Sequence, residues 1–134
     1  MPVLTIFNGL FCHAEAVVRD IMGSTGHRLI TDSDIITRAV QQFDMPENKL
    51  RRAFSAKTSV FNKFTREKEC AIACLRLAMA RLLDNTPAIV HGFGGLLIPQ
   101  TVSHGLRVCL IAEMPYRIHL AMSEEGLSEK DAVK

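Results

Sequence analysis

Residues 3–16 read VLTIFNGLFCHAEA, and within this stretch one apolar pattern gives way to another. Val3 to Phe7 is a short apolar run rich in β-forming residues, which is typical of a strand buried on both faces. From His13 to Met22 the apolar residues recur at helical spacing and form one stripe, at Ala14, Val17, Val18 and Ile21. The stretch therefore predicts a buried strand, a turn that begins at Gly9 and an amphipathic helix.

The alternation of strands and helices continues along the chain. The first helix is expected to end within the turn Gly23 to Gly26. Further strands are predicted near residues 28–31, 88–92 and 106–112. Helices are predicted after the N-cap candidates 31–34, over 47–54, between 65 and 82, from Pro115 to Met122 and after Ser128. This alternation favours an α/β fold with a parallel sheet and helices on both of its faces.

Length and composition limit the class of protein. The 134 residues indicate a single domain, residues 1–134, and 48% hydrophobic with 22% charged residues suits a full core. Residues 44–65 are more polar and are predicted to form a mobile flap. The net charge of +2 argues against a nucleic-acid partner, which needs clustered cations. The lack of a long apolar segment or signal peptide favours a cytoplasmic protein with no membrane partner.

The cysteines do not suggest a metal site. They lie at positions 12, 70, 74 and 109, with neither metal-site spacing nor a C-x-x-C pair. We therefore expect no metal ligands and reduced, mostly buried thiols. Cys12 stands beside His13, but adjacent residues rarely point at each other, so a catalytic pair is not predicted.

The turn at Gly9 has the spacing of a phosphate-binding loop, G-x-x-x-x-G-K-[ST], whose backbone amides and lysine hold phosphate oxygens. Gly9 opens the motif, and Ala14 replaces its second glycine. Glu15 replaces the lysine and Ala16 replaces the hydroxyl residue. Two interpretations stay open: a nucleotide site that has lost its chemistry, or a strand-to-helix turn that never had any.

Later motifs resemble those of cytidylate kinases and follow in the family's order. Residues 32–38 resemble the D-S-G-A-I-Y-R segment, with identity at Asp32, Ser33, Ile36 and Arg38. Residues 88–99 look like the family's strand and G-R-D-x-G turn, and residues 106–117 are similar to the next strand and the E-E-R-A helix. Residues 125–132 resemble the G-L-S-x-x-x-A start of the lid segment. The resemblance spans nearly the whole chain, although the family's last strand and the C-terminal part of its lid have no counterpart.

The resemblance implies a three-layer P-loop kinase fold with a four-stranded parallel sheet in the order 2-3-1-4. The family transfers a phosphoryl group from ATP, with magnesium, to cytidine monophosphate. By the same resemblance, the nucleotide-binding positions are Gly9, His13, Ala14, Glu15, Ser33, Arg38, Gly92 and Gly94, and Arg117 lies near the transferred phosphate. Without the resemblance, the simpler interpretation is that Ser33 caps a helix and Arg38 faces solvent.

Three cations that would serve phosphoryl transfer are missing from these motifs. Glu15 places a carboxylate where the lysine belongs, and a unit-charge contact at about 4 Å is worth roughly 4 kcal/mol at an effective dielectric constant near 20. Phe93 stands in place of an arginine, and residues 118–121 lack the family's further arginines. His13 could restore positive charge only when protonated.

These losses predict a degenerate, non-catalytic regulatory or scaffolding module that binds nucleotide weakly at most. The alternative is an active nucleoside monophosphate kinase of unusual mechanism that uses ATP and magnesium. A third interpretation is an interaction module whose likeness to a kinase is accidental.

The missing last strand of the family would cover residues 106–112. Open sheet edges are seldom left bare, because their unpaired backbone groups recruit other strands. We therefore expect this edge to be covered by a partner chain such as a second copy, by a repositioned local segment, or by the rest of a longer polypeptide.

Overall fold

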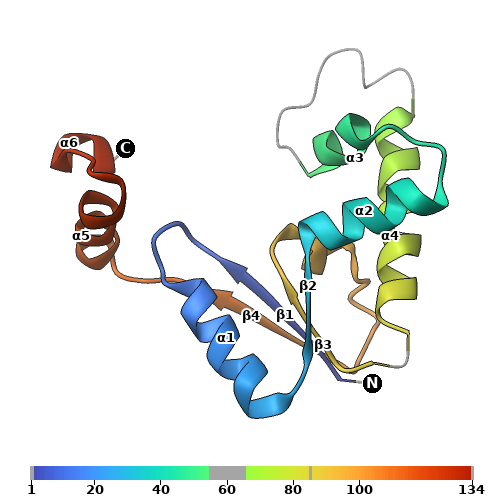
Figure 1. Ribbon diagram of the computed structural model, residues 1–134, viewed down its shortest axis with the longest axis horizontal. Helices are drawn as coiled ribbons and strands as arrows, with labels where there is room; N and C mark the ends of the chain where they lie inside the picture. Colours follow the sequence, from blue (N-terminus) through green and yellow to red (C-terminus); the bar gives the residue numbers. More distant parts are fainter. Residues whose placement is uncertain (1, 55–65, 85, 134) are drawn as a thin grey trace.

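Four parallel strands form the centre of the computed structural model, which describes residues 2–54, 66–84 and 86–133 (Figure 1). They are β1 (Val3–Asn8), β2 (Arg28–Thr31), β3 (Ala88–His91) and β4 (Gly105–Leu110). Their order is β2-β3-β1-β4, which confirms the sequence prediction. In the register, Ile6 of β1 lies beside His91 of β3 and Val108 of β4, so the carboxyl ends of these strands meet at one edge of the sheet.

Helices cover both faces, as predicted. The helices that pack against the sheet or against one another are α1 (Ala14–Thr25), α2 (Asp32–Gln42), α3 (Glu47–Ala53) and α4 (Glu67–Leu82). The connection from β3 to β4 contains the short 3-10 helix η2 (Phe93–Leu97), and α5 (Met114–Glu125) and α6 (Glu129–Ala132) follow β4. α1 ends at Thr25 and is capped by Gly26, whose φ of 67° is left-handed, so the helix ends within the expected turn Gly23 to Gly26.

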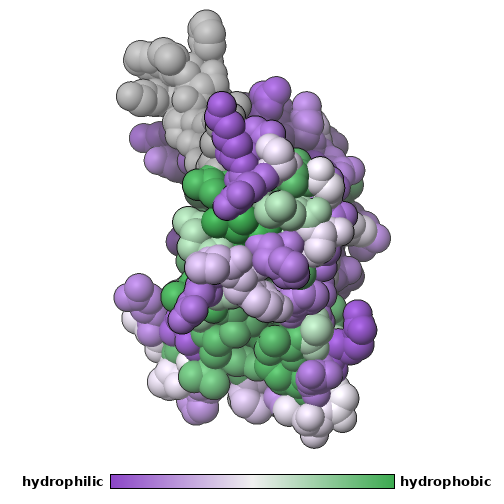
Figure 2. All heavy atoms as spheres, turned by 90° about the vertical axis from the view of Figure 1, so that its left-hand side faces the viewer, coloured by the Kyte–Doolittle hydropathy of each residue, from purple (hydrophilic) through white to green (hydrophobic). Residues whose placement is uncertain are grey.

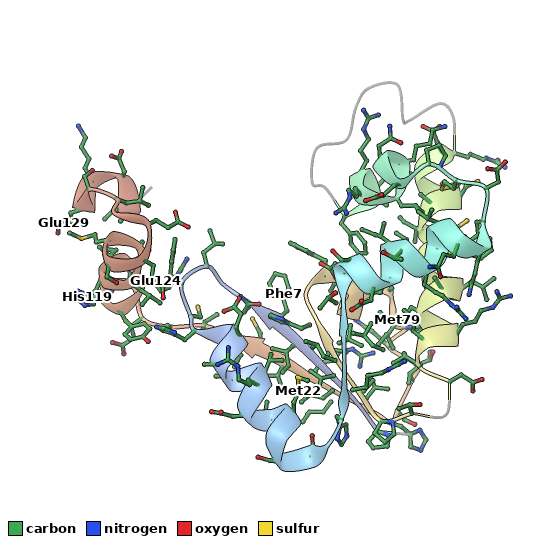
Figure 3. The ribbon with its side chains drawn as sticks, in the orientation of Figure 1. Phe7, Met22, Met79, His119, Glu124 and Glu129 are labelled. Atoms are coloured by element: carbon green, nitrogen blue, oxygen red, sulfur yellow. The ribbon has the colours of Figure 1, made fainter. Side chains whose placement is uncertain are left out.

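Apolar side chains fill the layers on either side of the sheet. On one side, Ile35, Leu50 and Leu75 bring α2, α3 and α4 into a common core with Val90 of β3. On the other, Val18 of α1 packs with Ile6 and Ile89. Met79 of α4 belongs to the first group and Met22 of α1 to the second, and Figure 3 shows them on different sides of the sheet. Alternate residues of each strand therefore supply two separate cores.

The predicted flap, residues 44–65, lies only partly within the described residues. Its first portion contains α3, where Leu50 is fully buried and Lys49 forms an ion pair with Glu67 of α4. Residues 55–65 lie outside the described part of the chain. Among the described helices, none is both long and apolar enough to cross a membrane.

The strand β4 lies at the edge of the sheet and, among the described residues, pairs only with β1. Leu106 is 65% exposed on one face of β4, and Cys109 is exposed on the other. Figure 2, which shows the side that lies to the left in Figure 1, has a broad apolar area in the lower half of the molecule. α5 and α6 run away beyond the end of β4 and do not lie along this edge (Figure 1).

The expectation of mostly buried thiols is wrong. Cys70 and Cys109 are exposed, and Cys12 and Cys74 are only partly buried. The spacing of apolar residues predicted the strand that contains Cys109, but its exposure depends on the edge position of that strand in the sheet.

Truncating a core residue of α4 tests this packing. Leu75→Ala is expected to lower the free energy of unfolding by about 2–5 kcal/mol, because Leu75 is fully buried and its loss leaves a cavity. Leu77→Ala on the same helix, where the side chain is 44% exposed, is expected to cost less than about 1 kcal/mol. Urea denaturation followed by circular dichroism measures both. Equal losses would contradict the orientation of α4.

Candidate functional site

The loop between β1 and α1 lies at the carboxyl edge of the sheet. The Gly9 amide donates to the Leu110 carbonyl of β4 at 3.0 Å, which anchors the start of the loop. Phe11 and His13 adopt left-handed backbone conformations, with φ of 56° and 51°. Side chains seldom accept such φ values, which glycine adopts without strain. The backbone of the loop is therefore strained at Phe11 and His13, where glycine would adopt the same φ values without strain.

Side chains crowd the start of this loop. A Cβ on Gly9 would lie 3.4 Å from Cys12 Sγ and 4.0 Å from Arg117 Cζ. Arg117 Nε donates to the Leu10 carbonyl at 2.8 Å, so part of the guanidinium is already engaged by the loop itself. The structure thus brings together Gly9 and Arg117, two predicted site residues that lie far apart in the sequence.

The helix α5 also contacts the end of the loop. His13 Nε2 lies 3.9 Å from Glu124 Oε1, and its ring centroid is 6.1 Å from that of Tyr116. Glu15 is exposed in the first turn of α1, and Ala14 before it is buried. A carboxylate in the first turn interacts favourably with the helix dipole, so Glu15 occupies by itself the electrostatic position that a bound anion would use.

Thr31 forms the N-cap of α2. The Asp34 amide donates to Thr31 Oγ1 at 3.3 Å, and the Thr31 amide donates to Asp34 Oδ2 at 2.8 Å, which completes a capping box. Ser33 and Arg38 are both exposed on α2, five residues apart and thus about 140° apart around the helix axis. The interpretation of Ser33 as a helix cap is therefore wrong, and the two side chains leave the helix in different directions.

Asp32 links the start of α2 to the turn after β3. Its Oδ2 accepts a hydrogen bond from the Phe93 amide at 3.0 Å, and its Oδ1 accepts one from the Gly94 amide at 2.7 Å. Gly92 has a φ of 113°, and a Cβ there would lie 2.7 Å from Asp32 Oδ2. A Cβ on Gly94 would collide with Ile35 of α2. Asp32 and Ile35 therefore leave no room for a side chain at either glycine.

The resemblance singled out the segment that contains Asp32 but gave this residue no role. The sequence signal that could have identified the role of Asp32 is an aspartate at the first position of a helix, followed later in the chain by a glycine-rich turn. The same turn places Phe93 beside Phe7, with ring centroids 5.3 Å apart in an edge-to-face arrangement. An aromatic contact therefore stands where the family motif has an arginine.

With the fold and loop described, the comparisons identify the family. The model of the cytidylate kinase-like family matches residues 3–134, and the chain belongs to that family. The crystal structure of an uncharacterized protein from Eubacterium ventriosum has a similar fold, with a TM-score of 0.64, 12% identity, and coverage of 98% of this chain and 69% of that chain. TT1252 from Thermus thermophilus gives a TM-score of 0.49 and 17% identity, over 98% and 76% of the two chains. Comparison with curated proteins finds no match.

Family membership confirms the resemblance that the motifs indicated, so the likeness is not accidental. The residues of the loop nevertheless do not fit the magnesium ion that the family's reaction uses. Ala16 presents a methyl group where the motif has a hydroxyl ligand. Within residues 2–54, 66–84 and 86–133, no three His, Cys, Asp or Glu side chains gather as metal ligands do.

Removing the Asp32 carboxylate tests its structural role. Asp32→Ala is expected to lower the free energy of unfolding by about 1–3 kcal/mol, because two backbone amides lose their acceptor. Ser33→Ala, one residue on and exposed, is expected to change it by less than about 0.5 kcal/mol. Chemical denaturation compares the two, and a neutral Asp32→Ala would overturn the assignment.

Proposed function

We propose that this chain is a non-catalytic member of its family, a regulatory or scaffolding module that binds nucleotide weakly at most. The observation that carries the proposal is Glu15, an exposed carboxylate in the first turn of α1, at the lysine position of the phosphate loop. Phosphoryl transfer depends on positive groups that stabilise charge on the transferred phosphate. A carboxylate at this position repels every anion that approaches the helix N-terminus.

The surrounding contacts support the same proposal. Arg117 is the cation nearest to Gly9 in the contacts described above, yet its Nε is bonded to the Leu10 carbonyl. The carboxylate of Glu124 faces His13 and adds a second negative group at the end of the loop. Asp32 already accepts the amides of Phe93 and Gly94, which would otherwise be available to an anion.

An active nucleoside monophosphate kinase is the second candidate, and the position of Arg117 against the loop favours it. In that case Arg117 would contact the transferred phosphate and Arg38 the acceptor nucleotide. A coupled assay for ADP formation from ATP and CMP separates the candidates. Activity that is lost in Arg117→Ala and in Arg38→Ala would establish the kinase and overturn our proposal.

Reversing the charge of the loop tests the electrostatic basis of the proposal. Glu15→Lys is expected to tighten ATP binding at least about tenfold, equivalent to 1.4 kcal/mol, because it replaces repulsion by attraction. Asp20→Lys is the matched control, since it makes the same charge change at an exposed position later in α1. Isothermal titration calorimetry with ATP and magnesium measures both. Micromolar binding by the unaltered chain, or equal gains in both variants, would contradict the proposal.

We also propose that the open edge of β4 is an association surface, for a second copy or for further polypeptide. Within the described residues no local segment pairs with this edge, and Leu106 is 65% exposed beside it. Such an edge would otherwise expose a row of unpaired backbone groups.

Light scattering after size exclusion is expected to show a dimer at about 100 μM protein, a concentration at which weak interfaces are populated. Leu106→Lys should make the protein monomeric, because it places a charge beside the edge. Leu77→Lys, at an exposed position on α4, should not. A monomer whose β4 amides exchange freely with solvent would count against the homodimer and leave further polypeptide as the occupant.

A further inference from the structure

A pocket of about 340 Å³ lies between the sheet and the β3–β4 connection. Thr5 and Phe7 of β1 line it together with Arg107 and Cys109 of β4. These four side chains share one face of the sheet, because the register places Thr5 beside Arg107 and Phe7 beside Cys109. The connection supplies the remaining wall, which includes Gly92, Gly95, Leu96, Ile98 and Gln100. Of the nucleotide-site positions discussed above, only Gly92 lines this pocket.

Thr5 is the buried polar residue of the described core, with 7% of its surface exposed. Within residues 2–54, 66–84 and 86–133 its hydroxyl makes no hydrogen bond, and the oxygen is not fully enclosed, since Gln42 Oε1 is the enclosed unpaired side-chain atom of those residues. The connection lies close above it, since a Cβ on Gly95 would come within 3.0 Å of Thr5 Cβ. Thr5 lines the pocket, so its hydroxyl can donate to or accept from a molecule there, which the valine typical of such a strand position could not do. The unpartnered hydroxyl of Thr5 therefore faces a space that suits a ligand.

Arg107 supplies a positive charge to the same pocket. Its Nη2 donates to the Pro99 carbonyl at 2.9 Å, which fixes the guanidinium against the β3–β4 connection. A guanidinium has five N–H donors, and only this bond is made to the described residues. No carboxylate of the described residues lies within ion-pair distance of Arg107. The fixed and unpaired cation is complementary to a single negative charge.

We propose that this pocket binds a small carboxylate with an aromatic body. The carboxylate pairs with Arg107, a second polar atom of the ligand accepts from Thr5, and the body packs on Phe7, Leu96 and Ile98. Figure 3 shows Phe7 near the end of β1, at the part of the sheet that this pocket adjoins. One cation and apolar walls do not suit a triphosphate, so this site is separate from the proposed loss of nucleotide binding. Its volume lies in the range of small-molecule sites, about 300–1,000 Å³.

Two matched probes test the proposal on the full chain. 1-Naphthoate carries the carboxylate, and 1-naphthamide has the same rings without the charge. In calorimetric titrations, 1-naphthoate is expected to bind at least tenfold more tightly than 1-naphthamide. In nuclear magnetic resonance spectra, 1-naphthoate is expected to shift the signals of Thr5 and Arg107 and not those of α1.

Substitutions test whether Arg107 supplies the positive charge that binds the carboxylate. Arg107→Gln should remove the preference for 1-naphthoate, whereas Arg19→Gln on α1, also exposed, should keep it. Thr5→Val, which keeps the shape of the side chain, should weaken the binding of 1-naphthoate without unfolding the protein. Bound 1-naphthoate should also slow the alkylation of Cys109 by iodoacetamide, while exposed Cys70 on α4 reacts at an unchanged rate.

The proposal is wrong if 1-naphthoate shows no saturable binding at millimolar concentration, or if both probes bind equally to the unaltered chain. It is also wrong if binding survives unchanged in Arg107→Gln. Binding that weakens as the protein concentration rises would show that a second copy of the chain fills the pocket, and would overturn the small-molecule assignment. ATP titrations of Glu15→Lys report on the phosphate loop alone, so failure here is distinct from failure of the proposed function.

Discussion

The two hydrogen bonds from the Phe93 and Gly94 amides to Asp32 set the path of the chain after β3. They hold the turn against the first residue of α2, so close that neither Gly92 nor Gly94 tolerates a side chain. From this fixed point η2 crosses toward β4 on the side of the sheet opposite α1. The position of Phe93 and the wall of the pocket over Thr5 both follow from that crossing.

The same bonds support the proposal that the chain does not transfer a phosphoryl group. Backbone amides at the ends of parallel strands are natural anion sites, and here a carboxylate of the protein uses two of them. In the loop between β1 and α1, the Glu15 carboxylate interacts favourably with the dipole of α1, and Arg117 donates a hydrogen bond to the Leu10 carbonyl. These backbone amides and the Arg117 guanidinium thus have partners within the protein. Under the proposed function, such internal contacts stabilise the fold and leave little electrostatic advantage for a nucleotide.

The strands and most helices could be predicted because they depend on local periods, and the order of the strands could be predicted from the resemblance to the family. The runs at Val3 and Ala88 are mostly apolar, as buried parallel strands require, and the helices α2 and α6 begin after the caps Thr31 and Ser128. The role of Asp32 could not be predicted, since its partners lie more than sixty residues away. The exposure of Cys109 was predicted wrongly for a related reason: a strand's composition does not say whether it lies at an edge.

The sequence by itself determined the class of fold, the family and the reversal of charge at position 15, because each is a property of residue types and their spacing. Only the tertiary structure decided which groups became partners. It placed Arg117 against Leu10, and put Thr5 and Arg107 side by side beneath the β3–β4 connection. These relations depend on strand register and crossover geometry, which bring distant residues together and which no local pattern encodes.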